Sequence, residues 1–421
     1  MEQFAYTLDA ARKLDGQDPL GAYRQRFLIP QHNGTDMVYF TGNSLGLQPK
    51  TTRDYLQQEL NDWAAFGVEG HFLAKNPWLS YHEILTDKTA KLVGALPSEV
   101  VMMNQLTVNL HLLMVSFYRP TPQRYKILCE AKAFPSDQYA LQSQAKFHGF
   151  DPADALVEIG PREGEYEIRH EDIYAAIEMH RDSLALVMIG GVNYFSGQVF
   201  DMKAITEAGH KAGAIVGFDL AHGAGNLELA LHDWNIDFAA WCSYKYLNAG
   251  PGSVAGAFVH ERHHKNTELP LFAGWWGHDK DTRFKMDKVF KPIESVERWQ
   301  LSNAPILSMA AYKASLDIFD EVGMKALTKK SRELTAYLEF VVNTINQTKN
   351  NCLEIITPKE RRGCQISIVA HGHGKSLYDK LIAHGVIPDW REPNVIRCAP
   401  VPMYNSFEDI FRFGEILMKL L

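Results

Sequence analysis

A lysine and an aspartate, each at the end of an apolar run, are the residues best placed to do chemistry. Lys245 follows such a run and precedes a glycine-rich turn in SYKYLNAGPG, residues 243–252. A lysine there can reach into a cleft while the glycines let the backbone approach a ligand. Asp219 ends IVGFD, and a buried carboxylate needs a cationic partner, such as a protonated pyridine nitrogen. The ordinary alternatives are a surface lysine and an aspartate that caps a helix starting at Ala221.

A phosphate site is indicated farther toward the N-terminus. The segment NQLTVNLHLLM, residues 104–114, has the pattern of a strand end followed by an amphipathic helix. A helix that begins at Thr107 would direct free backbone N–H groups and its positive dipole end toward an anion, as a phosphate requires. Leu106 and Thr107 are therefore candidates for a phosphate-binding turn. An ordinary threonine N-cap explains the same residues.

The segment AFPSDQYA, residues 133–140, could place an aromatic ring against a flat ligand. It follows the β-rich run YKILCE, so that Phe134 could stack on a ring while Ser136 and Asp137 open the next helix. The alternative is an aromatic core residue followed by a polar helix start. A phosphate cap, an aromatic platform, an aspartate and a lysine thus follow one another, each at a strand end, and together they favour a single ligand site.

The elements that must position these residues form an alternating pattern. Between about residues 95 and 260, helix-like segments separate short β-rich runs, which are VVMMN, YKILCE, LALVMIG, AIVGFDL and FAAWCS. One of the helical segments, DMKAITEAGHKAG, ends at Gly213, a plausible stop before the next strand. This rhythm predicts a mainly parallel sheet covered by helices. Ligands of such sheets bind at the carboxyl ends of the strands, where the candidates fall.

The pattern of apolar residues changes from about residue 304. A long helical stretch interrupted near Gly323 is followed by the strand-like runs CLEIIT, CQISIVA and NVIRCA, which predict a separate α+β unit. The first 45 or so residues are expected to return and pack against it. We therefore predict an α/β fold with a large ligand-binding domain at 50–295, built on a mainly parallel central sheet, and a smaller α+β domain from 1–49 and 296–421.

Composition favours a small-molecule partner. The 421 residues are 46% hydrophobic and carry a formal charge of -7, which gives no basic surface for nucleic acid. No apolar run has the length of a signal peptide core or of a membrane span. We therefore expect no membrane or nucleic-acid partner.

Cysteine and histidine usage indicates neither disulfides nor a metal. The five cysteines are scattered without a C-x-x-C pair, as in a protein of the reducing cytoplasm. Histidines gather in HERHHK, residues 260–265, and HGHGK, residues 371–375. Neither segment has the spacing of a zinc site, and we interpret both as solvated loops.

Long blocks of the sequence resemble the kynureninase family, which belongs to the aspartate-aminotransferase-like, fold type I enzymes that depend on pyridoxal 5'-phosphate (PLP). The resemblance extends over the whole chain and is most specific in GFDLAHGAGNLELALHDWNIDFAAWCSYKYLNAGPG. The other matching stretches are YFTGNSLGLQPK, FPSD, GWWGH, TRFKMD and VIRCAPVPMYNSF. The fold implied is a PLP-dependent transferase-like large domain with a smaller α+β domain.

The resemblance implies roles for individual residues. Lys245 resembles the lysine that holds PLP as a Schiff base, and Asp219 the partner of the pyridinium nitrogen. Tyr244 is similar to a residue that reaches the phosphate, and it is with Lys245 a candidate for acid–base catalysis. The other implied cofactor contacts within the chain are Leu106, Thr107, Phe134, Pro135, Ser136, Asp137 and His222.

The resemblance also implies a homodimer with shared active sites. Trp275 and Asn303 match positions that the neighbouring subunit contributes to the cofactor site. Arg397 resembles the arginine that binds the substrate α-carboxylate, a task that suits a planar guanidinium. His71, Ser302 and Asn303 resemble the polar pattern of enzymes that prefer the 3-hydroxy substrate.

The activity implied is hydrolytic Cβ–Cγ cleavage of L-kynurenine, 3-hydroxy-L-kynurenine or both, in tryptophan breakdown or NAD biosynthesis. The alternatives on the same fold are an aminotransferase and a desulfurase, which needs a nucleophilic cysteine, whereas Cys364 and Cys398 lie in strand-like runs. An alternative from another class is a serine hydrolase, because GNSLG, residues 42–46, fits G-x-S-x-G. Its context is wrong, since Pro49 follows where a helix should begin.

Overall fold

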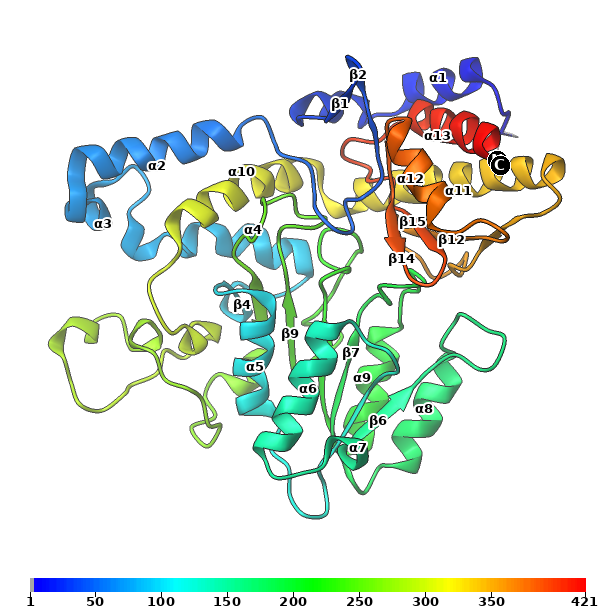
Figure 1. Cartoon of the computed structure of the whole chain (residues 1–421). Coiled ribbons are helices and arrows are strands. Elements are labelled where there is room, and N and C mark those ends of the chain that lie inside the picture. Colours follow the sequence, from blue (N-terminus) through cyan, green and yellow to red (C-terminus); the bar gives the residue numbers. More distant parts are fainter. Residues whose placement is uncertain (1–3) are drawn as a thin grey trace.

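A seven-stranded sheet forms the centre of the larger unit in the computed structural model (Figure 1), in the order β4-β10-β9-β8-β7-β5-β6. The model describes residues 4–421, so residues 1–3 of the predicted small domain lie outside it. β10 alone runs opposite in direction to the other six strands of this sheet, which confirms the predicted α/β class with a mainly parallel sheet. The strands are β4 (Val100–Met102), β5 (Lys126–Glu130), β6 (Leu156–Ile159), β7 (Leu184–Gly190), β8 (Ile215–Asp219), β9 (Phe238–Trp241) and β10 (Gly256–Val259).

Both faces of this sheet are covered, which is why its strands read as continuous apolar runs. Along β7, Leu186 and Met188 join one hydrophobic core, while Val187 and Ile189 join another on the opposite face. Helices α5 and α6 contribute to the first core, and α8 and α9 to the second. The helices of this unit are α4 (Glu83–Val93), α5 (Leu106–Phe117), α6 (Pro135–Phe147), α7 (Pro152–Ala155), α8 (His170–Met179) and α9 (Met202–Lys211).

A second unit carries a four-stranded antiparallel sheet in the order β11-β12-β15-β14. Its strands are β11 (Leu353–Ile355), β12 (Ile366–Ala370), β15 (Val395–Cys398) and β14 (Asp389–Arg391), and its helices are α11 (Met324–Thr348), α12 (Lys375–Ala383) and α13 (Phe407–Leu420). Helix α10 (Ile306–Val322) leads into it. The break predicted near Gly323 is confirmed, because this glycine has φ 77°, which ends α10 and lets the chain restart as α11.

The N-terminal segment packs against this second unit. Helix α1 (Leu8–Gln17) lies beside α13, and β3 (Val38–Tyr39) pairs in parallel with β13 (Val386–Ile387). A two-stranded hairpin, β1 (Gln31–His32) and β2 (Thr35–Asp36), precedes β3. Helices α2 (Thr52–Phe66) and α3 (Gly70–Leu73) follow; α2 packs against α10, and its far end and α3 lie at the upper left of Figure 1. The predicted boundaries at 49/50 and 295/296 stay a prediction.

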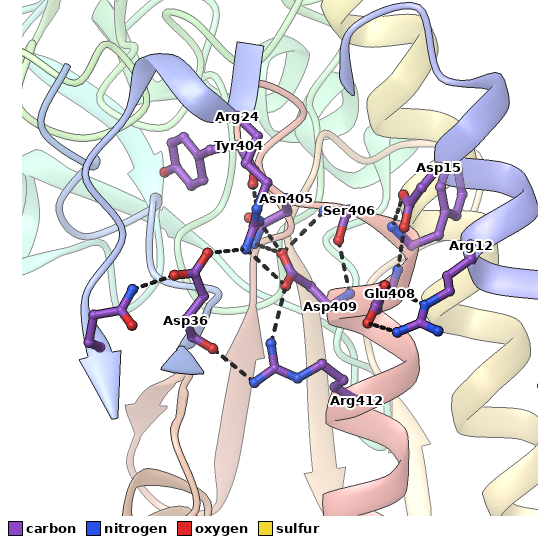
Figure 2. Close-up of polar contacts among 12 residues, drawn as sticks. Arg12, Asp15, Arg24, Asp36, Tyr404, Asn405, Ser406, Glu408, Asp409 and Arg412 are labelled. Carbon is purple, nitrogen blue, oxygen red and sulfur yellow. Dashed lines mark hydrogen bonds and ion pairs between the residues drawn. The ribbon is translucent and has the colours of Figure 1, made fainter. Parts of the chain in front are cut away.

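Polar contacts fix the N-terminal segment to α13 (Figure 2). The carboxylate of Asp15 accepts from the backbone N–H groups of Phe407 (2.7 Å) and Glu408 (2.9 Å), the first residues of α13. Those N–H groups have no partner inside the helix, and an acidic group there also offsets the helix dipole. Arg24 Nη1 lies 2.6 Å from Asp409 Oδ2, whose side chain is buried. The segment that leads into residues 42–46 is thereby held in place.

None of the helices within residues 4–421 combines the length and apolar character needed to cross a bilayer.

Candidate active site

A cavity of about 220 Å³ lies at the carboxyl edge of the large sheet. Its walls come from the first turns of α5 and α6 and from the segments that follow β5, β7, β8 and β9. The structure brings together these predicted residues: Leu106, Thr107, Phe134, Ser136, Asp137, Asp219, His222, Tyr244 and Lys245. It adds residues that were not predicted: Gln105, Glu130, Gly190, Val192, Tyr194 and Ala221.

Lys245 and Asp219 face the same cavity. The Lys245 Nζ atom lies 5.8 Å from the centroid of the Phe134 ring, so the amine and the aromatic face border one space. Asp219 is 7% exposed, and its Oδ1 accepts from the Ala221 N–H at 2.6 Å. Residues 221–226 form turns and not a helix, so the alternative that Asp219 caps a helix is wrong. Asp219 does accept the backbone hydrogen bond that a capping residue would accept.

The segment 42–46 packs directly against the backbone of Tyr244 and Lys245. The Gly46 N–H donates to the Tyr244 carbonyl at 2.8 Å. A Cβ atom at Gly46 would lie 2.3 Å from the Lys245 carbonyl oxygen, so only glycine permits this approach. Ser44 is exposed, and the helix that follows begins only at Thr52. The strand–turn–helix of a serine hydrolase is therefore not formed at GNSLG.

The first turn of α5 offers an anion site. The helix begins at Leu106, one residue earlier than predicted, and Thr107 lies inside its first turn, so its side chain is not the N-cap. Asn104 adopts φ 49°, which turns the chain sharply from β4 into the helix. The N–H groups at this end of α5 have no intrahelical acceptor, and with the helix dipole they favour a phosphate at the cavity wall.

Three carboxyl groups, those of Glu130, Asp137 and Asp219, gather on one part of the cavity wall. Burial raises the pKa of Asp137 well above its ordinary value, and a charge and hydrogen bond from Asp219 raise it further. Burial followed by the Asp219 charge raises the pKa of Glu130 to about 8. Two carboxyls that share a buried site cannot both ionise at neutral pH without a cation between them. This wall is therefore suited to a positively charged ring nitrogen.

Two basic or phenolic groups of the cavity are kept uncharged. Burial first, and then the nearby charges of Lys245 and Arg397, lower the pKa of His222 well below its ordinary value. Burial first, and then the neighbouring Cys242 thiol, raise the pKa of Tyr244. At neutral pH the cavity therefore offers a neutral imidazole and a protonated phenol.

The walls fit the PLP expected from the sequence. Oε1 of Glu130 and Nδ1 of His222 are buried without a hydrogen-bond partner, as polar atoms are at a ligand site. A flat aromatic side chain, a carboxylate pair, a lysine amine and a helix N-terminus together suit a planar cationic ring that bears an aldehyde and a phosphate. Together these groups form the candidate cofactor site.

Arg397 lies just behind this cavity and does not line it. Its side chain is 1% exposed, its Nη1 donates to the Tyr194 carbonyl at 2.5 Å, and its Nη2 pairs with Asp389. Tyr194 does line the cavity, and its ring packs edge-on against Phe134 at 5.2 Å. One backbone carbonyl thus links the predicted carboxylate-binding arginine to the site.

The remaining predicted residues lie outside the cavity of this chain. Pro135 occupies the first position of α6 and is exposed, and Trp275 is 45% exposed. Ser302 and Asn303 line a separate hollow that shares only Gln105 with the candidate site. His71 is half-buried on α3, with its Nδ1 2.9 Å from the Val68 carbonyl.

The interpretation of HERHHK as a solvated loop is wrong. His260 and His264 are buried, and His263 Nε2 lies 2.8 Å from the buried carboxylate of Asp237. His260 Nδ1 faces Glu99 Oε1 at 3.6 Å. Buried carboxylates attract such partners, which a linear reading of the loop does not reveal. In HGHGK, by contrast, His371 is exposed.

Comparisons with known proteins agree on the fold. The chain superposes on a cysteine desulfurase from Thermococcus onnurineus with a TM-score of 0.74 at 18% identity, covering 91% of this chain and 94% of that one. A cystine C–S lyase gives a TM-score of 0.76 at 16% identity, with coverage of 90% and 97%. The predicted fold class is confirmed by these neighbours.

Sequence comparisons are more specific. Residues 327–417 match the model of the kynureninase C-terminal domain. The kynureninase of Flavobacterium psychrophilum is 60% identical over 418 residues, which cover 99% of this chain and 98% of that protein. The kynureninase of Myxococcus xanthus is 55% identical over 410 residues, covering 97% and 96%. The chain therefore belongs to the kynureninase family.

Proposed function

We propose that this enzyme is a PLP-dependent hydrolase that cleaves the Cβ–Cγ bond of L-kynurenine, 3-hydroxy-L-kynurenine or both. Water adds across that bond, giving L-alanine and anthranilate or 3-hydroxyanthranilate. The observation that carries the proposal is the shared cavity of Lys245 and Asp219, in a chain that is 60% identical to a kynureninase over nearly its whole length. Family membership supports the enzyme class and the cofactor together.

The cavity suggests which residues hold the cofactor. Lys245 would bind it covalently, Asp219 would face its ring nitrogen, and Phe134 would stack on its ring. Leu106 and Thr107 at the start of α5, together with Tyr244, would hold the phosphate. When bound, PLP supplies an electron sink for bonds broken at the substrate α and β carbons.

Proton transfers fall to groups of this chain. The Lys245 Nζ atom, once free, is placed to take the substrate α proton, because it borders the same cavity as the face of the Phe134 ring, on which the cofactor would stack. Tyr244 keeps its phenolic proton at neutral pH, because burial raises its pKa, and it is suited to donate a hydrogen bond. His222 stays neutral and adds no positive charge beside Lys245.

A desulfurase is not favoured, although the fold neighbours include one. That reaction needs an accessible thiolate. Cys364 and Cys398 are buried, and burial raises the pKa of the Cys364 thiol to about 12. All five cysteines are free thiols, which supports our proposal of a cytoplasmic location.

We propose a homodimer in which each subunit completes the site of the other. Large apolar side chains are exposed around α2 and α3, namely Trp63, Val68, Phe72 and Leu73. Several large apolar side chains exposed close together on a surface are typical of a protein–protein interface. His71 lies among these residues, while Trp275, Ser302 and Asn303 lie outside the cavity of their own chain. We expect the polar side chains of His71, Ser302 and Asn303 to favour the 3-hydroxy substrate.

The function is tested by product analysis. Purified protein with PLP should release alanine and the matching anthranilate from kynurenine and 3-hydroxykynurenine. We expect kcat/KM to be at least about tenfold higher for the hydroxylated substrate, because polar side chains that dimer formation buries at the site would discriminate for a hydroxyl. Cysteine serves as the comparison substrate. Sulfur release from cysteine without cleavage of either kynurenine would contradict the proposal.

Shared sites are tested by mixing two defective variants. Lys245→Ala and Trp275→Ala should each lose most activity, yet mixed and allowed to exchange subunits they should regain roughly a quarter of wild-type activity, since heterodimers hold one intact site. Lys245→Ala mixed with Asp219→Ala is the matched control, because both residues line the cavity of one chain. Recovery in the control, or none in the first mixture, would count against shared sites.

A further inference from the structure

Glu130 is a buried carboxyl group of the cavity that the proposed chemistry does not use. It ends β5, next to β7 in the sheet, and β8 lies on the other side of β7. Gly190 ends β7 and is paired in register with Asp219 at the end of β8. A Cβ atom at Gly190 would lie 3.5 and 3.6 Å from the two carboxylate oxygens of Glu130. Glu130 and Asp219 thus flank a position without a side chain.

The surroundings of Glu130 do not support a charge. The residue is 6% exposed, its Oε1 has no hydrogen-bond partner, and it forms no ion pair within residues 4–421. Asp219 repels its ionised form, and only the side chain of Asn193 opposes this by a hydrogen bond. A buried carboxyl without a cation neutralises by keeping its proton. The other titratable groups of the cavity are Asp137, Tyr194, Asp219, His222, Tyr244 and Lys245.

We propose that Glu130 is a positioning residue that stays a neutral carboxylic acid in the folded enzyme, so that it places no second negative charge beside Asp219, which would face a cationic ring nitrogen. The role of that nitrogen rests on the proposed function, whereas the state of Glu130 does not. An ionised Glu130 across Gly190 would add a second negative charge near the ring nitrogen and compete with Asp219 for it. Glu130 acts through Asp219 and is not itself a catalytic residue.

The test compares the stability of the PLP-free protein and of Glu130→Gln as the pH changes. Because the folded pKa is about 8 and lies above the ordinary value, the unfolded chain loses this proton first as pH rises. The urea midpoint of the wild type should therefore fall relative to Glu130→Gln from about pH 5 to about pH 8 and then level off. Parallel profiles would overturn the proposal.

Glu158→Gln is the matched control. Glu158 lies on β6, opposite Cys129 of β5, but is exposed, so this variant should follow the wild-type profile. If Glu130→Gln does not fold, infrared spectra of wild-type protein with ¹³C-labelled glutamate carboxyls decide the question. A neutral acid C=O band that disappears near pH 8 supports the proposal, and no such band at neutral pH overturns it.

The link to Asp219 has a spectroscopic readout. The PLP-loaded wild type should show a pH-dependent change in cofactor absorbance, at a pH above the ordinary pKa of a glutamate, that Glu130→Gln lacks. The absence of that change would overturn the positioning role. Failure of the wild type to bind PLP would instead reject the proposed function, while the PLP-free profiles would still report the state of Glu130.

Discussion

Replacing Lys245 with alanine should reduce turnover of kynurenine by more than about 10³-fold, because the change removes both a covalent attachment point and a base for the α proton. The same variant should lose the visible absorbance of lysine-bound PLP. Borohydride treatment followed by mass spectrometry should label the wild-type peptide 243–252 with one cofactor and leave the variant unlabelled. The fold should persist, since the Lys245 side chain faces a cavity and not the core.

Lys203→Ala is the matched control for this experiment. Lys203 is exposed on α9, away from the cavity, and its replacement should leave activity and labelling unchanged. A Lys245→Ala variant that still turns over substrate and still becomes labelled would remove Lys245 from its proposed role. Labelling on another lysine of the wild type would have the same consequence.

The strand-end residues could be predicted because local sequence carries their signal. In a parallel sheet every strand that ends at the same edge delivers its next residues to one place, so Asp219, Phe134 and Lys245 could be grouped from the pattern alone. The strands themselves were readable because they are buried on both faces and therefore continuously apolar. Their relative order along the sheet depends on crossovers, which the pattern does not specify.

Glu130 carried the same kind of signal and was missed. It ends the predicted strand YKILCE as Asp219 ends IVGFD, but the pattern alone does not distinguish the last residue of a strand from a side chain of the site. Tyr194 had no such signal. It reaches the cavity from a loop beyond β7, and its carbonyl meets Arg397, more than 200 positions later. Contacts of this kind are set by packing between the two units.

Two strands of the large sheet were also not predicted. β10 is four residues long and directly follows a glycine-rich turn, so its β-rich signal is weak. β6 is only partly buried at the edge of the sheet and lacks the continuous apolar run of the central strands. The edge strand β4 could be predicted because its residues are all buried and apolar, so continuous burial, and not position in the sheet, gives the signal that β6 lacks.

The contacts of Arg397 leave the Nε side of its guanidinium without a hydrogen-bond partner, at a buried position just outside the cavity wall. Nη1 donates to the Tyr194 carbonyl and Nη2 to Asp389, while Nε is buried without a partner. Nε and the second hydrogen of Nη2 form the side-on pair that a carboxylate accepts with two parallel hydrogen bonds. We therefore expect the substrate carboxylate to bind there while Asp389 keeps its place.

Arg397→Lys should raise the KM for kynurenine about 10- to 100-fold and change kcat much less, because an ammonium keeps the charge but not the two parallel hydrogen bonds. This variant is preferable to Arg397→Ala, which would remove one of the two arginine partners of the half-buried Asp389 and would also open a cavity at a fully buried position. Arg391→Lys is the control, since Arg391 Nη2 pairs with the same Asp389 at 3.2 Å from a more exposed position. Steady-state kinetics of both variants provide the measurement. An unchanged KM in Arg397→Lys, or an equal rise in Arg391→Lys, would show that Arg397 supports the small sheet and does not bind the substrate carboxylate.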